Sequence, residues 1–133
     1  MRFSYLCRME RNTFADFKFN KQLLSAIEEA GYTAPTVIQQ KAIPPVLAGQ
    51  DVMGIAQTGT GKTAAFVLPL LMKLKYAQGN DPRALILSPT RELAMQVNDA
   101  LVRITRLDRD TMPRMRVQMG AVAGETGLVA ATT

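Results

Sequence analysis

The chain contains the stretch Ala56-Gln57-Thr58-Gly59-Thr60-Gly61-Lys62-Thr63, between an apolar run at 51–55 and a helix-like segment at 64–75. A strand, a glycine loop and a helix in this order are the context that a phosphate-binding loop requires. The two glycines tolerate backbone dihedral angles that other residues resist, so the loop can wrap closely round an anion. Its N–H groups and the helix N-terminus would then face the phosphates of a nucleotide.

Two side chains at the end of this loop have the chemistry of catalytic ligands. Lys62 adds a positive charge for the β and γ phosphates, and the Thr63 hydroxyl is placed to ligate Mg²⁺. Ala56 stands at the first position, where the strict pattern has glycine. A plain glycine turn between a strand and a helix is the alternative, but the flanking pattern favours nucleotide binding.

The composition is that of one ordinary globular domain. The chain has 133 residues, of which 47% are hydrophobic, and its single cysteine, Cys7, allows no internal disulfide. We therefore expect a reducing, cytoplasmic compartment. The absence of histidine excludes a zinc site built on histidine and a histidine-based catalytic triad. The net charge of +5 suits a polyanionic partner, although many soluble proteins are equally basic.

Two short helices are predicted before the glycine loop. Asn20 can cap a helix that runs to about Ala30, and Gly31 supplies its C-terminal stop. Thr36 can cap a second helix, which we expect the prolines at 44 and 45 to interrupt. No apolar run approaches the roughly 18 residues of a membrane span, and residues 1–12 are expected to be a loose extension rather than a signal peptide.

A second strand–helix unit is predicted after the glycine loop. The helix after the loop contains Pro69, which favours a kink or an early end. The stretch 76–82 is polar and loop-like, and the run Arg83-Ala84-Leu85-Ile86-Leu87 after it is typical of a buried parallel strand. A helix follows with Leu93, Val97, Leu101 and Ile104 on one face, and the alternation at 115–119 is compatible with a third strand. Two such units in succession favour a parallel sheet with right-handed crossovers. Ligands bind beyond the carboxyl ends of such strands, where the loop at 56–63 and the turn at 89–92 both lie.

The motifs together resemble those of the DEAD-box RNA helicases. The run Gly31-Tyr32-Thr33-Ala34-Pro35-Thr36-Val37-Ile38-Gln39 is similar to the Q motif of that family, and residues 56–63 match its motif I, including the leading alanine. Pro89-Thr90-Arg91-Glu92-Leu93-Ala94 matches motif Ia. Phe14 stands where the family has an isolated aromatic that stacks on adenine, whereas core packing is preferred for Phe17 and Phe19.

This resemblance implies an α/β P-loop NTPase with an incomplete RecA-like parallel sheet flanked by helices. Residues 13–106 would be the N-terminal part of RecA-like domain 1, and residues 107–133 a divergent tail. ATP and Mg²⁺ would be the cofactors and RNA the partner, bound without sequence preference through its backbone. The residues implied for the adenine nucleotide are Phe14, Tyr32, Gln39 and 56–63, with Thr63 on the metal, and those implied for RNA are Pro89, Thr90, Arg91 and Glu92.

The resemblance weakens toward the C-terminal end. The acidic Asp-Glu-Ala-Asp motif of the family, its Ser-Ala-Thr motif and the arginines of its second domain are not present in these 133 residues. We therefore expect a truncated chain that binds ATP but does not hydrolyse it usefully by itself, with an exposed sheet edge and marginal folding. Two alternatives to a helicase stay open: a catalytically inactive adenine-nucleotide-binding module, and an unrelated P-loop kinase or transporter ATPase, against which the Q motif argues.

Overall fold

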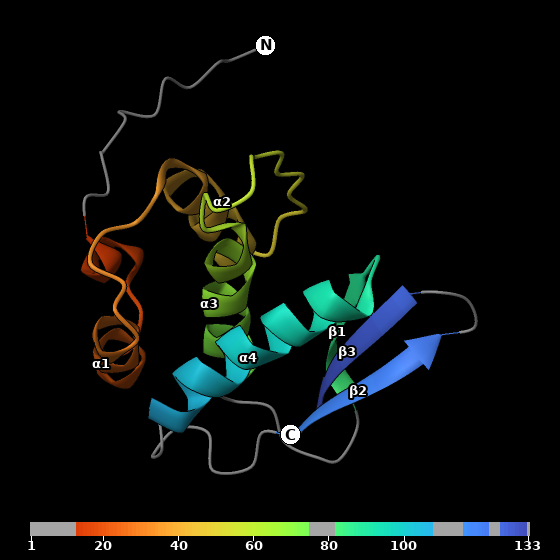
Figure 1. Cartoon of the computed structure of the whole chain (residues 1–133). Coiled ribbons are helices and arrows are strands. Elements are labelled where there is room, and N and C mark those ends of the chain that lie inside the picture. Colours follow the sequence, from red (N-terminus) through yellow and green to blue (C-terminus); the bar gives the residue numbers. More distant parts are fainter. Residues whose placement is uncertain (1–12, 75–81, 108–115, 123–125, 133) are drawn as a thin grey trace.

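The computed structural model describes residues 13–74, 82–107, 116–122 and 126–132. Helices lie beside one small sheet, and the longest helix runs between the two (Figure 1). In chain order the elements are η1 (Phe14–Phe17), α1 (Lys21–Glu29), α2 (Val37–Leu47), α3 (Lys62–Leu74), β1 (Pro82–Ser88), α4 (Arg91–Leu107), β2 (Arg116–Val122) and β3 (Thr126–Thr132). The expected extension at 1–12 and most of the expected loop at 76–82 lie outside the described residues.

The first helix begins and ends as its sequence predicts. The Asn20 side chain accepts a hydrogen bond from the backbone N–H of Leu23 at 2.7 Å, which satisfies a donor that the first helical turn leaves free. At the other end Gly31 takes φ +85°, and its N–H donates to the Glu28 carbonyl. This left-handed conformation costs glycine little, because glycine has no Cβ. The predicted cap and the predicted stop of this helix are both confirmed.

Helix α2 corrects one prediction, because it continues through Pro44 and Pro45. A proline removes the hydrogen bond that its N–H would make to the residue four positions earlier. The carbonyls of Gln40 and Lys41 therefore lose a helical donor. Gln40 is half-buried and Lys41 is exposed, so water can reach both carbonyls. Helix α3 likewise runs past Pro69 to Leu74, so the early end that we expected there is wrong.

The sheet corrects the predicted parallel arrangement. Its strand order is β1-β3-β2, and β3 pairs antiparallel with both neighbours, Leu87 facing Leu128 on one side and Gly120 facing Leu128 on the other. The predicted strand at 83–87 is confirmed as β1, and the predicted third strand at 115–119 falls mostly within β2. The direction of pairing was wrong because a short apolar run identifies a buried strand without specifying the direction of its neighbour.

The expected strand at 51–55 is not formed. The backbone at 51–57 is described without regular secondary structure, and Met53 and Ile55 are 91% and 90% exposed. A strand is defined by its backbone partners, and none of the described strands pairs with this segment. The sequence pattern is strand-like, but the segment stays unpaired.

The core lies among the four helices. Helix α4 presents Val97, Leu101 and Ile104 to this core, as its apolar spacing predicts, whereas Leu93 is 39% exposed. Leu101 and Arg103 illustrate how α4 is held: Leu101 is fully buried, and the Arg103 guanidinium donates to the Ala30 carbonyl at the end of α1. No helix in the described part of the chain is both long and apolar enough to cross a membrane. Further buried members of the core are Phe17, Phe19, Leu23, Ile27, Ile43, Leu68 and Leu71.

Candidate functional site

The loop at 56–63 has the backbone shape that its glycines predict. Gly59 and Gly61 take φ +81° and +82°, in the left-handed region that favours glycine. The Thr60 hydroxyl donates to the Gln57 carbonyl at 2.6 Å and closes the turn. The loop then enters the 13-residue helix α3 at Lys62, so the N–H groups that a helix N-terminus leaves without helical partners directly follow the loop. This shape can hold an anion.

The Lys62 side chain folds back over the loop. Its Nζ donates a hydrogen bond to the Ala56 carbonyl, six residues earlier, while the side chain remains exposed. Thr63 follows in the first turn of α3 and is half-buried. To reach a phosphate, the Lys62 ammonium has to exchange the carbonyl for the ligand, and its exposure leaves it free to do so. The assigned roles of both residues stay predictions.

Gln39 connects the second helix to the glycine loop. Its side chain is 1% exposed, its Oε1 accepts from the Thr36 N–H at 3.0 Å, and its Nε2 donates to the Gly61 carbonyl at 3.0 Å. A Cβ added at Gly61 would overlap this Nε2, so glycine is required by contact as well as by dihedral angle. The adenine role assigned to Gln39 stays a prediction, and the sequence prediction missed Thr36 as a hydrogen-bond partner of this side chain. The Thr-x-x-Gln spacing of a capping box was the signal.

The two predicted aromatic ligands lie together but are largely covered. The Phe14 ring centroid is 6.2 Å from that of Tyr32, edge to face, and 6.1 Å from that of Phe17. Phe14 is only 5% exposed, so its ring is part of the core in this structure, as are Phe17 and Phe19. Stacking of Phe14 on an adenine therefore requires the aromatic cluster to open, and this role stays a prediction.

The predicted RNA-binding turn lies at the start of α4 and is exposed. Pro89, Thr90, Arg91 and Glu92 are all solvent-accessible. The Thr90 hydroxyl oxygen accepts from the Leu93 N–H at 3.2 Å and so caps the helix, which leaves the hydroxyl proton available to a ligand. The N-terminus of a 17-residue helix, a hydroxyl and a guanidinium thus meet at one exposed point.

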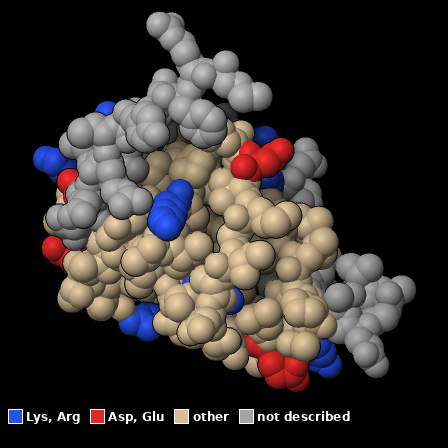
Figure 2. Space-filling view, turned by 90° about the horizontal axis from the view of Figure 1, so that it is seen from above, with Lys and Arg blue, Asp and Glu red and all other residues tan. Residues whose placement is uncertain are grey.

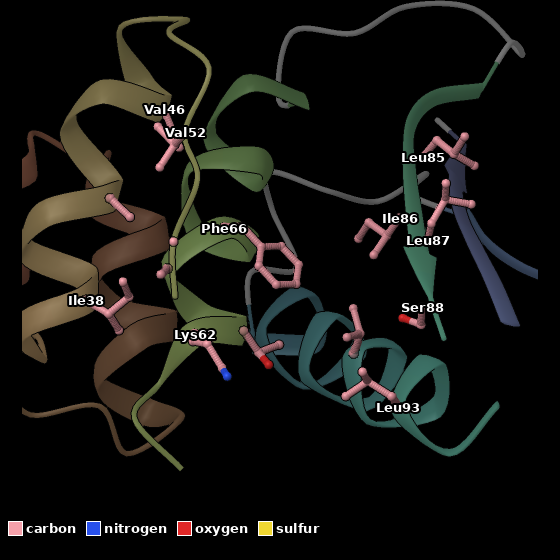
Figure 3. Close-up of a pocket in the computed structure, with 15 residues that line it drawn as sticks. Ile38, Val46, Val52, Lys62, Phe66, Leu85, Ile86, Leu87, Ser88 and Leu93 are labelled. Carbon is pink, nitrogen blue, oxygen red and sulfur yellow. The ribbon is translucent and has the colours of Figure 1, made fainter. Parts of the chain in front are cut away.

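A groove of about 510 Å³ connects the glycine loop with this turn. Lys62 lies toward the same end of the groove as Ser88 and Leu93 (Figure 3), and Thr63 also lines the groove. The predicted proximity of the two motifs is therefore supported by their shared groove, although the described strands pair antiparallel and do not form the parallel sheet from which we inferred it. Ser88, which is 4% exposed, is a polar groove residue that we did not predict, and its position at the end of an apolar strand was the available signal.

The charge distribution gives no large basic patch on the face shown in Figure 2. Lys and Arg side chains lie apart from one another there, and uncharged residues form most of the described surface. Within the described residues, no group of three or more His, Cys, Asp or Glu side chains is placed to hold a metal ion. The net charge therefore gives little support for an RNA-binding surface, and the candidate site consists of the loop at 56–63 and the turn at 89–92.

The comparisons with known proteins agree with these motifs. The family model for the DEAD/DEAH box helicases matches residues 36–127, which is more than half of the chain and extends into the tail that we expected to diverge. The chain is 49% identical over 110 residues to the ATP-dependent RNA helicase SrmB of Escherichia coli, a match that covers 78% of this chain and 25% of SrmB. It is 53% identical over 91 residues to the ATP-dependent RNA helicase DeaD of Mycobacterium tuberculosis, covering 68% of this chain and 16% of DeaD.

Solved structures give the same result for the fold. The RNA helicase Prp28 from Chaetomium thermophilum, crystallised with ADP, matches 71% of this chain with a TM-score of 0.67 and 39% identity, over 24% of its own length. The predicted RecA-like α/β class is therefore confirmed, apart from the parallel sheet. The chain spans about a quarter or less of the length of these proteins. On the family match and these identities, the chain belongs to the DEAD-box RNA helicases.

Proposed function

We propose that this chain binds an adenine nucleotide at the loop 56–63 and RNA at the turn 89–92, as part of an ATP-dependent RNA helicase. The observation that carries the proposal is the loop itself. Two left-handed glycines precede a helix N-terminus, and a buried glutamine from the Q motif is hydrogen-bonded to that loop. The relatives named ATP-dependent RNA helicases and the Prp28 structure with ADP support it.

At the phosphate end, the chain supplies a cradle and a charge. The backbone N–H groups of the loop and of the first turn of α3 point toward the anion, and Lys62 neutralises part of its charge. Thr63 would hold Mg²⁺ through its hydroxyl, and the bound nucleotide with its metal supplies the phosphoryl group. The cradle fits a phosphate, because both glycines take the dihedral angles that bring backbone N–H groups together.

At the adenine end, the bonding capacity of Gln39 is the decisive quantity. A carboxamide has two N–H donors and two acceptor lone pairs, of which the Gly61 carbonyl and the Thr36 N–H each use one. One donor and one acceptor therefore remain, which is the pair that an adenine edge requires. The two internal bonds also fix which way the carboxamide faces before the nucleotide arrives.

At the RNA end, the contacts are those of backbone recognition. Arg91 can pair with a phosphate, and the Thr90 hydroxyl can donate to one while it still caps α4. Neither contact reads a base, so we propose binding without sequence preference. Among the described residues that line the groove with Lys62 and Thr63, none is acidic, and we propose that this chain alone binds ATP without useful turnover.

The experiment that tests the proposal is a titration of the purified chain with fluorescent ADP. We expect saturable binding that unlabelled ADP displaces and GDP does not, because Gln39 presents a donor and an acceptor that match adenine. Lys62→Ala and Gln39→Ala should each weaken binding. Lys73→Ala, which removes an exposed lysine elsewhere in the same helix, should leave it unchanged.

Three results would contradict parts of the proposal. Equal competition by GDP would remove the adenine role of Gln39, and unchanged affinity of Lys62→Ala would remove the phosphate role of the loop. ATP turnover that RNA stimulates and Lys62→Ala abolishes would show that the chain is an active enzyme rather than a binding module.

A further inference from the structure

Two consecutive glutamines of α2 hold the same peptide unit at its two ends. The Gln39 Oε1 accepts from the Thr36 N–H at 3.0 Å, and the Gln40 Nε2 donates to the Pro35 carbonyl at 3.1 Å. This carbonyl and this N–H belong to one planar unit, in which a trans bond makes them point in opposite directions. A rotation of the unit would therefore break both hydrogen bonds together.

The Gln40 side chain is not needed to form the helix itself. The Gln40 backbone N–H already donates to the Thr36 carbonyl at 2.9 Å, and the Gln39 carboxamide completes the capping box. Pro35 precedes the helix and is a buried residue, and a buried carbonyl without a donor is costly. Gln40, which is half-buried, supplies that donor. Its carboxamide thus acts on the entry to the helix.

The orientation of this peptide unit determines how firmly the Gln39 carboxamide is held. Gln39 is 1% exposed, and its two internal hydrogen bonds run to the Thr36 N–H and to the Gly61 carbonyl. If the peptide unit rotates, the first bond is lost, and the carboxamide is fixed at one point about which it can turn. The apparent affinity for a ligand falls in proportion to the fraction of molecules that have the competent orientation.

We propose that Gln40 is a positioning residue for the adenine contact: it fixes the peptide unit between Pro35 and Thr36, which in turn sets the Gln39 carboxamide for the adenine edge. This inference rests on the proposed adenine-binding function. The resemblance to the Q motif covers residues 31–39 and assigns no role to Gln40. The proposed role requires a side-chain donor at position 40, because the Pro35 carbonyl can only accept.

The test is a titration of the full chain and of its Gln40→Met variant with ADP and with GDP. Methionine is similar in length to glutamine but removes the donor. We expect the ADP affinity to fall about fivefold, as for one lost hydrogen bond, and the GDP affinity to stay within about twofold, because only adenine uses the positioned Gln39. The preference for ADP should therefore narrow, whereas a general loosening of the fold would weaken both nucleotides equally.

Two further variants sharpen this comparison. Gln40→Glu replaces the donor with a carboxylate that only accepts, so it should narrow the preference for ADP at least as much as Gln40→Met does. Gln50→Met makes the same exchange at an exposed residue beyond the C-terminal end of α2, and it should keep the preference within about twofold of that of the parent chain.

A second measurement requires no nucleotide. Urea unfolding of Gln39→Ala, Gln40→Met and the double variant completes a cycle. Because both side chains hold one peptide unit, the double variant should lose less stability than the two single losses added, by at least about threefold in the unfolding equilibrium constant. Additive losses, or an unchanged preference for ADP in Gln40→Met, would overturn this inference alone. Equal binding of ADP and GDP by the parent chain would overturn the proposed adenine function, and this inference with it.

Discussion

The substitution Gly61→Ala probes the contact between the Q motif and the glycine loop. Gly61 has φ +82°, and a Cβ at this position would overlap the Gln39 Nε2 and come within 3.2 Å of the Thr36 hydroxyl oxygen. Gly59 provides the matched control, because its φ is +81° but a Cβ there would meet nothing within 4 Å. The two substitutions therefore share one backbone cost and differ in the contacts that a Cβ at position 61 makes with Gln39 and Thr36.

The magnitudes follow from these two terms. The left-handed conformation costs an alanine about 1–2 kcal/mol, so Gly59→Ala should lower the free energy of unfolding by that amount. Gly61→Ala must in addition displace the Gln39 carboxamide from the Gly61 carbonyl, where losing a buried hydrogen-bond partner costs about 1–3 kcal/mol. We expect a total loss of about 2–5 kcal/mol for Gly61→Ala, as the sum of these two terms.

The assay is urea unfolding followed by circular dichroism, with the double variant Gln39→Ala/Gly61→Ala completing a cycle. If the Gln39 contact causes the extra loss, Gly61→Ala in the Gln39→Ala background should cost no more than Gly59→Ala does in the parent chain. Equal losses for the two glycine variants in the parent chain would refute the reasoning, because they would show that Gln39 does not resist a Cβ at position 61.

Three further outcomes follow from the described contacts. Leu101→Ala, at a fully buried core position, should lower the free energy of unfolding by about 2–5 kcal/mol in the same assay, and a loss below about 1 kcal/mol would mean that α4 is not packed as described. Asn20→Ala should cost about 1 kcal/mol while Asn20→Asp retains most of the stability, because aspartate keeps the acceptor for the Leu23 N–H and loses only the weak hydrogen bond that Asn20 Nδ2 donates to Met72 Sδ at 3.8 Å; equal losses would exclude a cap. Arg91→Ala should weaken binding of single-stranded RNA and reduce the slope of log affinity against log salt by about 0.7, as expected for one lost phosphate contact, and an unchanged slope would remove Arg91 from the RNA site.

The sequence predicted local structure well because local causes determine it. The cap at Asn20, the left-handed glycine at 31 and the two left-handed glycines of the loop depend only on nearby residues and on the absence of a Cβ. The apolar face of α4 follows from a spacing of three and four residues, and three of its four predicted members are buried. The glycine loop at 56–63 belongs to this local class, so the left-handed conformation of its two glycines was predictable.

The pairing of strands was not predictable, since it depends on residues far away in the chain. The run at 51–55 has the composition of a buried strand, yet none of the described strands pairs with it. The strand at 82–88 formed as expected, but antiparallel to a partner at 126–132 that the sequence did not indicate as a strand. The hydrogen bond from Gln39 Nε2 to the Gly61 carbonyl was equally hidden, because that carbonyl lies 22 residues further along the chain.

The bond between the Thr36 N–H and the Gln39 carboxamide oxygen has a consequence for observing this site. A backbone amide that donates to a buried acceptor exchanges its hydrogen with solvent deuterium slowly, because exchange requires the bond to open. The exchange rate of the Thr36 amide therefore reports the orientation of the Gln39 side chain. A carboxamide turned by half a rotation would present its NH₂ group to Thr36 and leave that amide without an acceptor. The exchange of one backbone hydrogen can thus show whether Gln39 already has, in the free chain, the orientation that the proposed adenine contact requires.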